Sequence, residues 1–100
     1  MSEVLLVTGG SRGIGAATAI CAAKKGWDIA INYARDANAA NKVAEEVKAL
    51  GRRSMEIKGD MTSEDDILNM FEQVEKGLGQ ITGLVNSAGT CLLYTSDAAD

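Results

Sequence analysis

Thr8-Gly9-Gly10-Ser11-Arg12-Gly13-Ile14-Gly15 is the stretch of this 100-residue chain that indicates its fold. It follows a wholly apolar run at residues 4–7, typical of a buried parallel strand, and it opens a segment with helical spacing of apolar residues. Phosphates approach a backbone closely only where side chains are missing, and a helix N-terminus offers unpaired N–H groups and a positive dipole end. Glycines at 9, 13 and 15 suit a tight turn, a close pyrophosphate and close helix–strand packing. The stretch therefore predicts a dinucleotide site, with a plain glycine turn as the alternative.

Strand patterns and helix patterns alternate along the rest of the chain. Strands are predicted at residues 4–7, 28–33 and 54–58, and a fourth begins at Leu84-Val85. The helices between them have apolar faces at Ile14, Ala17, Cys21 and Ala22, then at Ala40, Val43, Ala44 and Val47, and then at Ile67, Met70, Phe71 and Val74. We expect Asp36 to begin the second helix and Thr62 or Ser63 to cap the third. This order predicts an α/β fold, namely a partial Rossmann fold with a doubly wound parallel sheet.

Composition and charge exclude several classes of function. The chain contains no histidine, so no histidine-based triad and no histidine metal ligand can lie within it. Its net charge is −4 and it has no basic cluster, which argues against a nucleic-acid partner. It has no CxxC pair, no secretory signal and no apolar run long enough to span a membrane, so we expect a reduced, cytoplasmic protein without a membrane segment. Cys21 is expected to be packed on the apolar face of the first helix.

Three motifs in order carry a resemblance to a known family. Residues 8–15 resemble the TGxxxGxG motif of the short-chain dehydrogenases/reductases. Gly59-Asp60-Met61 is similar to the family's acidic corner, which contacts the adenine, and Asn86-Ser87-Ala88-Gly89 is similar to its NNAG motif, with serine in place of the second asparagine. The resemblance covers residues 1 to about 90 and is closest in character to the ketoacyl-reductase-like members. It implies the strand order 3-2-1-4, with the first two helices on one face of the sheet and the third on the other.

The residues alone leave alternatives open at the two later motifs. Asp60 can accept a hydrogen bond from an adenine amino group, or it can cap the next helix or hold a turn. Asn86 can tie neighbouring strand ends together through its side-chain amide. The resemblance favours cofactor contact, and the complete set of candidate cofactor-binding residues is Thr8, Gly9, Ser11, Arg12, Gly13, Ile14, Gly15, Tyr33, Ala34, Arg35, Asp60, Met61, Asn86, Ser87, Ala88 and Gly89.

Charge at the end of the second strand bears on which cofactor is bound. An NAD site usually places an acidic residue there to bind the ribose 2′-hydroxyl. Here the sequence is Asn32-Tyr33-Ala34-Arg35, without a carboxylate, and Arg35 and Arg12 are placed to reach a 2′-phosphate. We therefore predict NADP rather than NAD. The alternative for Arg35 is a solvated loop charge.

The residues that the family uses for chemistry are absent. The resemblance implies a serine and a Tyr-x-x-x-Lys motif, assisted by an asparagine, all beyond the fourth strand. Tyr94 does not match, because the residue four positions later is Ala98 and not a lysine. Ser96 does not match either, because it comes after Tyr94, whereas the family's serine precedes its tyrosine. We therefore expect an inactive chain that is the cofactor-binding part of a longer parent protein. The resemblance implies that this parent is an oxidoreductase, a homo-oligomer of the tetrameric kind common in the family, which transfers hydride between the nicotinamide and a small-molecule carbonyl or secondary alcohol. The charge at the end of the second strand predicts that its cofactor is NADP. The alternative is a free-standing dinucleotide-binding or sensor module.

The last ten residues differ from the rest of the pattern. Cys91-Leu-Leu-Tyr-Thr-Ser-Asp-Ala-Ala-Asp100 matches the translation of TGT CTC TTA TAC ACA TCT GAC GCT GCC GAC, which is similar to a transposase end joined to a sequencing-library adapter. The segment also lacks the cap and apolar period of a further helix. We therefore interpret residues 1–90 as the N-terminal NADP-binding half of a domain and residues 91–100 as a non-native tail without native packing. In such a half-domain we expect the face under the third helix to be largely bare and the fourth strand to be an unprotected edge.

Overall fold

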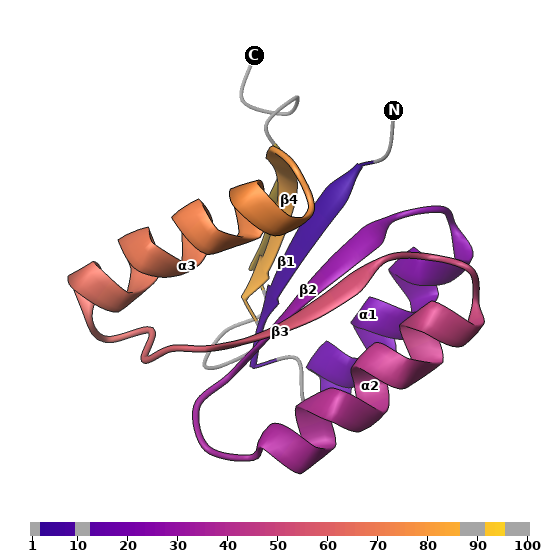
Figure 1. Ribbon diagram of the computed structural model, residues 1–100, viewed down its shortest axis with the longest axis horizontal. Coiled ribbons are helices and arrows are strands. Elements are labelled where there is room, and N and C mark those ends of the chain that lie inside the picture. The colour runs from indigo at the N-terminus through magenta and orange to yellow at the C-terminus, as the bar shows by residue number, and fades with distance from the viewer. Residues whose placement is uncertain (1–2, 10–12, 87–91, 96–100) are drawn as a thin grey trace.

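Strands and helices alternate along residues 3–9, 13–86 and 92–95, which are the residues that the computed structural model describes (Figure 1). The elements are β1 (Val4–Thr8), α1 (Gly13–Lys24), β2 (Asp28–Tyr33), α2 (Ala37–Ala49), β3 (Ser54–Lys58), α3 (Glu64–Gly77), β4 (Ile81–Asn86) and β5 (Leu92–Thr95). The strands form one sheet in the order β3-β2-β1-β4-β5, and β1 to β4 run parallel. The predicted α/β fold and the strand order 3-2-1-4 are therefore confirmed, although β4 begins three residues before Leu84.

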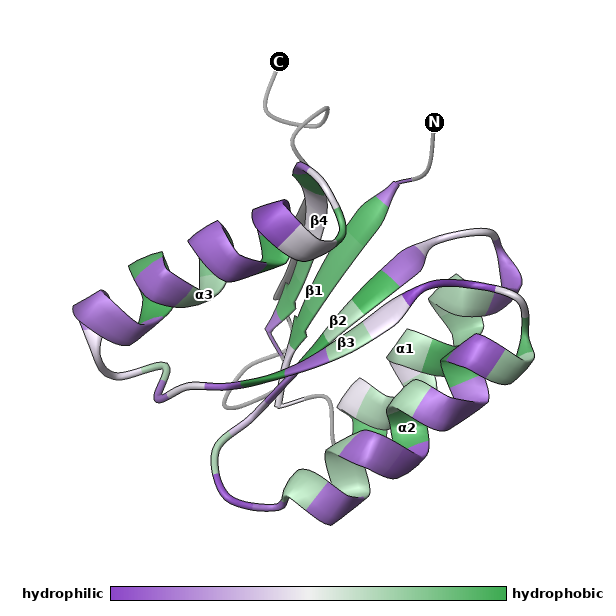
Figure 2. Cartoon of the chain, in the orientation of Figure 1, coloured by the Kyte–Doolittle hydropathy of each residue, from purple (hydrophilic) through white to green (hydrophobic). Residues whose placement is uncertain are grey.

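The two faces of the sheet are covered by different helices, as expected. α1 and α2 lie on one face, and α3 lies on the other (Figure 1). Alternate residues of β1 point to the two faces, so Leu5 and Val7 pack beneath α1 and α2, whereas Val4 and Leu6 pack beneath α3. Figure 2 shows β1 as a strongly hydrophobic strand and shows hydrophobic and hydrophilic residues alternating along α2 and α3. Each of these two helices thus buries one side against the sheet.

The predicted faces and caps of α2 and α3 are confirmed. The four predicted residues of α2 are buried, and in α3 Met70 and Val74 are buried while Ile67 and Phe71 pack partly buried against them. Asp36 caps α2 by accepting a hydrogen bond from the backbone N–H of Ala39 at 3.0 Å. Ser63 caps α3 by accepting one from the N–H of Asp66 at 3.3 Å. Among the described residues no helix combines the length and the apolar character needed to cross a membrane.

The face that α1 buries is not the predicted one. Its buried residues are Gly15, Ala19 and Ala23, whereas Ile14 is 66% exposed and Cys21 is also exposed. The prediction that Cys21 packs in the core is therefore wrong. Glycine, alanine or isoleucine occurs on every side of this helix, so the apolar period could not select the side that meets the sheet.

Two expectations about uncovered surface are also wrong. β5 pairs antiparallel with β4, from Gly83 opposite Thr95 to Asn86 opposite Leu92, so β4 is not an unpaired edge. The face under α3 is not bare, because Val4, Leu6 and Ala30 are at most 1% exposed. α3 contacts both β3 and β4. In the sheet, β2 and β1 lie between these two strands, so β3 and β4 are about 14 Å apart. Its 14 residues span about 21 Å, enough to cross all four strands.

An ionic cluster around Asp28 lies at the amino end of β2. The side chain of Asp28 is fully buried, and its two oxygens accept hydrogen bonds from the guanidinium groups of Arg52 and Arg53 at 3.0–3.3 Å. The backbone N–H of Arg53 also donates to Asp28, and its guanidinium donates to the carbonyl of Leu78 at 2.7 Å. This cluster therefore joins β2, the start of β3 and the end of α3.

Candidate functional site

The predicted site residues that are described lie at the carboxyl ends of the parallel strands. Thr8 of β1 lies opposite Asn86 of β4, and Tyr33 of β2 lies opposite Lys58 of β3. The segments that follow β2 and β3 hold Ala34, Arg35, Asp60 and Met61. Four strand ends therefore bring these residues to one edge of the sheet, which is where ligands bind in open α/β sheets.

The glycines between β1 and α1 have the backbone geometry that close approach of a phosphate requires. Gly9 has a φ of 65° and Gly13 a φ of 63°, a left-handed conformation that side chains disfavour. No described atom lies within 4 Å of the position that a Cβ would take at Gly13, so the space before its backbone is open. Gly15 is buried in the first turn of α1, as its predicted packing role requires, and Ile14 is exposed beside it. The two remaining predictions here, Ser11 and Arg12, lie outside the described residues.

Asn32 is a residue of this edge that was not predicted from the sequence. It is 3% exposed, and its Oδ1 accepts a hydrogen bond from the backbone N–H of Gly9 at 3.1 Å. Its Nδ2 donates to the carbonyl of Gly59 at 3.2 Å and lies 3.1 Å from the Sδ of Met70. One amide therefore joins the start of the glycine-rich loop to the end of β3. The signal that could have found it is a single amide after the apolar residues 29–31 of β2, directly before the strand's last residue.

Asn86 ties neighbouring strand ends together, which is the structural alternative for this residue. Its Oδ1 accepts a hydrogen bond from the hydroxyl of Thr8 at 3.0 Å, and that hydroxyl also lies 3.3 Å from the carbonyl of Val85. Thr8 is itself fully buried. The rest of the predicted motif, Ser87, Ala88 and Gly89, lies outside the described residues.

Asp60 holds a turn after β3. Its Oδ1 accepts hydrogen bonds from the backbone N–H and the hydroxyl of Thr62, at 2.8 and 2.6 Å, and these two bonds lower the pKa of the carboxyl group. The backbone N–H of Asp60 donates to the carboxylate of Asp66 at 2.9 Å, which fixes the turn to the first turn of α3. The Asp60 side chain is exposed, whereas Met61 packs against the core beneath α3. Holding the turn leaves the carboxylate ionised and facing solvent at this edge.

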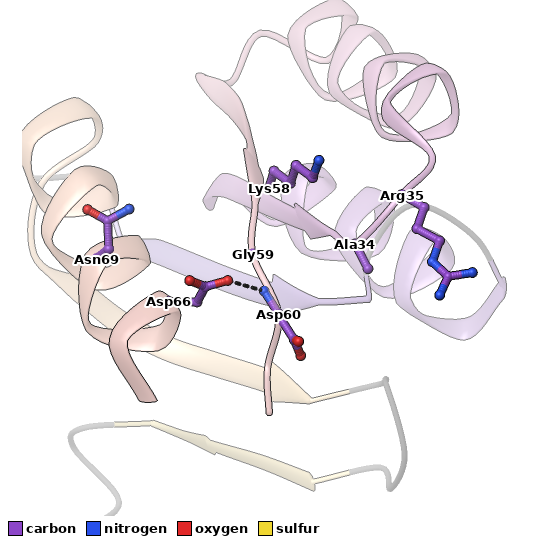
Figure 3. Close-up of a pocket in the computed structure, with 7 residues that line it drawn as sticks. All are labelled: Ala34, Arg35, Lys58, Gly59, Asp60, Asp66 and Asn69. Carbon is purple, nitrogen blue, oxygen red and sulfur yellow. Dashed lines mark hydrogen bonds between the residues drawn. The ribbon is translucent and has the colours of Figure 1, made fainter. Parts of the chain in front are cut away.

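A pocket of about 440 Å³ lies between the ends of β2 and β3 and the start of α3 (Figure 3). Its lining residues are Ala34, Arg35, Lys58, Gly59, Asp60, Asp66 and Asn69. Ala34, Arg35 and Asp60 were predicted, whereas Lys58, Asp66 and Asn69 were not. Tyr33 lies beside the pocket but packs partly buried against the core beneath α1 and α2. The parallel register of β2 and β3 would have predicted Lys58, because it places the end of one strand beside the end of the other.

The groups at this edge fit a phosphorylated dinucleotide. Bare backbone at the start of α1 suits phosphate oxygens, a cationic side of the pocket suits a further phosphate, and carboxylates suit the amino group of a base. Within the described ranges, no group of three or more histidine, cysteine or acidic side chains could hold a metal ion.

Comparisons with known proteins agree with this geometry. A family model described as short chain dehydrogenase matches residues 3–100. The 3-oxoacyl-(acyl-carrier-protein) reductase FabG of Staphylococcus epidermidis is 39% identical over 89 residues, which is 89% of this chain and 36% of that protein. The hydroxynaphthalene reductase arp2 of Aspergillus fumigatus is 38% identical over 87 residues, or 87% of this chain and 32% of that protein.

Solved structures give the same result for the fold. The crystal structure of acetoin dehydrogenase from Enterobacter cloacae superposes with a TM-score of 0.82 at 33% identity, covering 90% of this chain and 36% of that one. A Serratia marcescens short-chain dehydrogenase/reductase variant gives a TM-score of 0.83 at 35% identity, covering 95% and 39% of the two chains. The chain therefore spans between 32% and 39% of the length of these similar proteins.

Proposed function

Because this chain belongs to the short-chain dehydrogenase family, we propose that it forms the cofactor-binding part of an NADP-dependent oxidoreductase. The parent protein would transfer hydride between the nicotinamide and a carbonyl or secondary alcohol of a small molecule. The reductases and dehydrogenases similar to this chain support such a reaction class. We also propose that the parent is a cytoplasmic homo-oligomer, in line with the family resemblance.

The observation that carries the choice of NADP is the charge at the end of β2. The residue directly after the strand is Ala34, and the next is the exposed Arg35. The nearest acid in sequence, Asp36, uses its Oδ1 to cap α2. A ribose 2′-hydroxyl would therefore find no carboxylate at the position where NAD sites usually have one, whereas a 2′-phosphate would find a guanidinium.

Within this proposal the chain's own residues bind and orient the cofactor. Gly9 and Gly13 would let the pyrophosphate approach the N-terminus of α1, and Arg35 would bind the 2′-phosphate. Asp60 would accept a hydrogen bond from the adenine amino group, for which its lowered pKa keeps it ionised. Thr8, Asn32 and Asn86 would act indirectly, by holding the strand ends that carry these groups.

The test is the affinity of the parent protein for the two cofactors after Arg35→Ala. A charge-assisted contact contributes about 1.5–3 kcal/mol, so the dissociation constant of NADPH should rise about tenfold or more. That of NADH should stay within about twofold, because NADH lacks the 2′-phosphate. Isothermal titration calorimetry measures both constants directly.

Lys48→Ala is the matched control, since it also removes one positive charge from an exposed side chain near α2, but outside the pocket. It should leave both dissociation constants unchanged. An equal loss of NADPH and NADH affinity in Arg35→Ala would refute the role of Arg35. If the unmodified parent bound neither NADPH nor NADH, the proposed function itself would be refuted.

A further inference from the structure

Lys58 reaches the corner occupied by Arg35 from a different strand. In the parallel pairing of β2 and β3, Lys58 lies opposite Tyr33, and the backbone N–H of Gly59 donates to the carbonyl of Tyr33 at 3.1 Å. Arg35 follows Tyr33 by two residues. The backbone that carries Lys58 is further fixed by Asn32, whose amide donates to the carbonyl of Gly59. Two independent chain segments therefore bring a cation to one corner of the sheet.

The pocket at this corner has charges of opposite sign on its two sides. Figure 3 shows Lys58 and Arg35 to one side of the backbone segment Gly59-Asp60, and Asp66 and Asn69 of α3 to the other. A phosphate entering the pocket would be attracted to the first side and repelled by the second. The second side instead suits a ligand group that donates hydrogen bonds. This polarity would orient a nucleotide with a phosphate on its ribose.

The fold itself makes little use of the charge of Lys58. Its side chain is exposed, and the ion pairs found among the described residues involve other lysines and arginines. The neighbouring acids have other hydrogen bonds: Glu56 accepts from Asn41 at 3.2 Å, and the carboxylate of Asp66 accepts from the N–H of Asp60. The ammonium group is therefore available to an anionic ligand in the pocket.

We propose that Lys58 is a second residue that determines cofactor specificity, binding the 2′-phosphate of NADP together with Arg35. This inference rests on the proposed function. A 2′-phosphate carries nearly two negative charges, so two cations from two strands would bind it more completely than one. Because the ribose of NAD carries only a hydroxyl at that position, Lys58 would contribute to NADP binding and not to NAD binding.

The experiment measures dissociation constants of 2′,5′-ADP and 5′-AMP for the parent protein, unmodified and with Lys58→Gln. These two probes differ only in the phosphate on the 2′-oxygen and need no catalysis. Lys58→Gln should weaken the binding of 2′,5′-ADP about tenfold and leave that of 5′-AMP within about twofold. Lys58→Arg should retain most of the affinity for 2′,5′-ADP. Lys76→Gln, on the distant end of α3, is the matched control and should change neither constant.

The outcomes separate this inference from the function on which it rests. If the unmodified protein prefers 2′,5′-ADP and Arg35→Ala removes that preference while Lys58→Gln has no effect, the role of Lys58 is refuted and the proposed function stands. Equal weakening of both probes by Lys58→Gln also refutes it, since the contact is then not with the 2′-phosphate. If the unmodified protein binds neither probe, the proposed function fails and this inference fails with it. Because Lys58 is exposed, unchanged thermal melting of the variants should confirm that they fold.

Discussion

Asn32 has a hydrogen-bonding role at the carboxyl ends of the parallel strands that no apolar side chain of β2 could fill. Its amide both accepts from the N–H of Gly9 and donates to the carbonyl of Gly59, in surroundings from which water is excluded. Burying an amide costs free energy unless its groups are paired, and here they are paired on both sides. Asn32 therefore links the segment after β1 to the segment after β3, although these two strands are not neighbours in the sheet.

Replacing Asn32 by alanine should lower the free energy of unfolding by about 2–3 kcal/mol, because it removes this partner from the partly buried N–H of Gly9 and from the buried carbonyl of Gly59. Asn32→Asp is the informative companion. It keeps an acceptor for Gly9 but turns a carboxylate toward the carbonyls of Ile57 and Gly59, so it should be at least as destabilising. Urea denaturation of the parent protein measures both, and a loss below about 0.5 kcal/mol in both variants would contradict the assigned role.

Element by element, the sequence was informative where hydrophobic and polar residues alternate and uninformative where they do not. α2 and α3 have one apolar side each, so their buried faces and caps could be predicted. α1 is apolar on every side, so its buried face could not. β5 could not be predicted because the short segment carries no period that distinguishes a strand from a loop. Asn32, Lys58 and Asp28 were missed because their roles depend on the register between neighbouring strands and on side-chain contacts, which the predicted strand order does not contain.

Acidification should weaken the connection between β2, β3 and α3 through Asp28. Burial by itself raises the pKa of this carboxyl group, but hydrogen bonds from the backbone and guanidinium of Arg53 and from Arg52 outweigh it, so the net pKa is lowered from 3.8. A folded-state pKa below the unfolded one contributes stability above the unfolded pKa, and this contribution is lost as the pH falls through the folded pKa. The free energy of unfolding should therefore decrease as the pH falls below about 4.

Asp28→Asn removes the titrating carboxyl group and so isolates its contribution to the pH dependence of the free energy of unfolding. Both arginine side chains are partly exposed, at 30% and 58%, so they can regain water and the variant should lose only about 2 kcal/mol at neutral pH. Its free energy of unfolding should also depend less on pH below 4 than that of the unmodified protein. Chemical denaturation at a series of pH values tests both statements, and an unchanged acid dependence would show that other carboxyl groups cause it.

At the scale of the whole molecule, we propose that the chain binds a cofactor but lacks the serine and the Tyr-x-x-x-Lys motif that the family resemblance implies for catalysis. The 100-residue chain should therefore show no NADPH-dependent reduction of carbonyl compounds, whereas the parent protein should. Spectrophotometric NADPH oxidation with a panel of ketones measures this. Turnover by the 100-residue chain, beyond that of a heat-treated sample, would contradict the prediction.

The nucleotide sequence past the codon for Thr90 distinguishes a longer enzyme from a free-standing binding module. We propose that residues 91–100 are not native, although the family model match runs to residue 100 and residues 92–95 pair with β4. Genomic DNA from unprocessed material should then diverge from the ten adapter-like codons and continue in frame to a Tyr-x-x-x-Lys motif. Finding those ten codons followed by a stop codon would favour the binding module.

The separation of the two ends of the sheet has an evolutionary consequence. The fold is held at the amino ends of the strands by the Asp28 cluster and at the carboxyl ends by buried amides and hydroxyls. Arg35 and Lys58, by contrast, are exposed and lie outside both cores. With the roles proposed for Arg35 and Lys58, we expect substitutions at these two positions to change the preferred dinucleotide with little loss of stability. Selection for a different redox pool could then act on them without compensating changes elsewhere. Cofactor preference is thus expected to diverge faster than the fold among descendants of this protein.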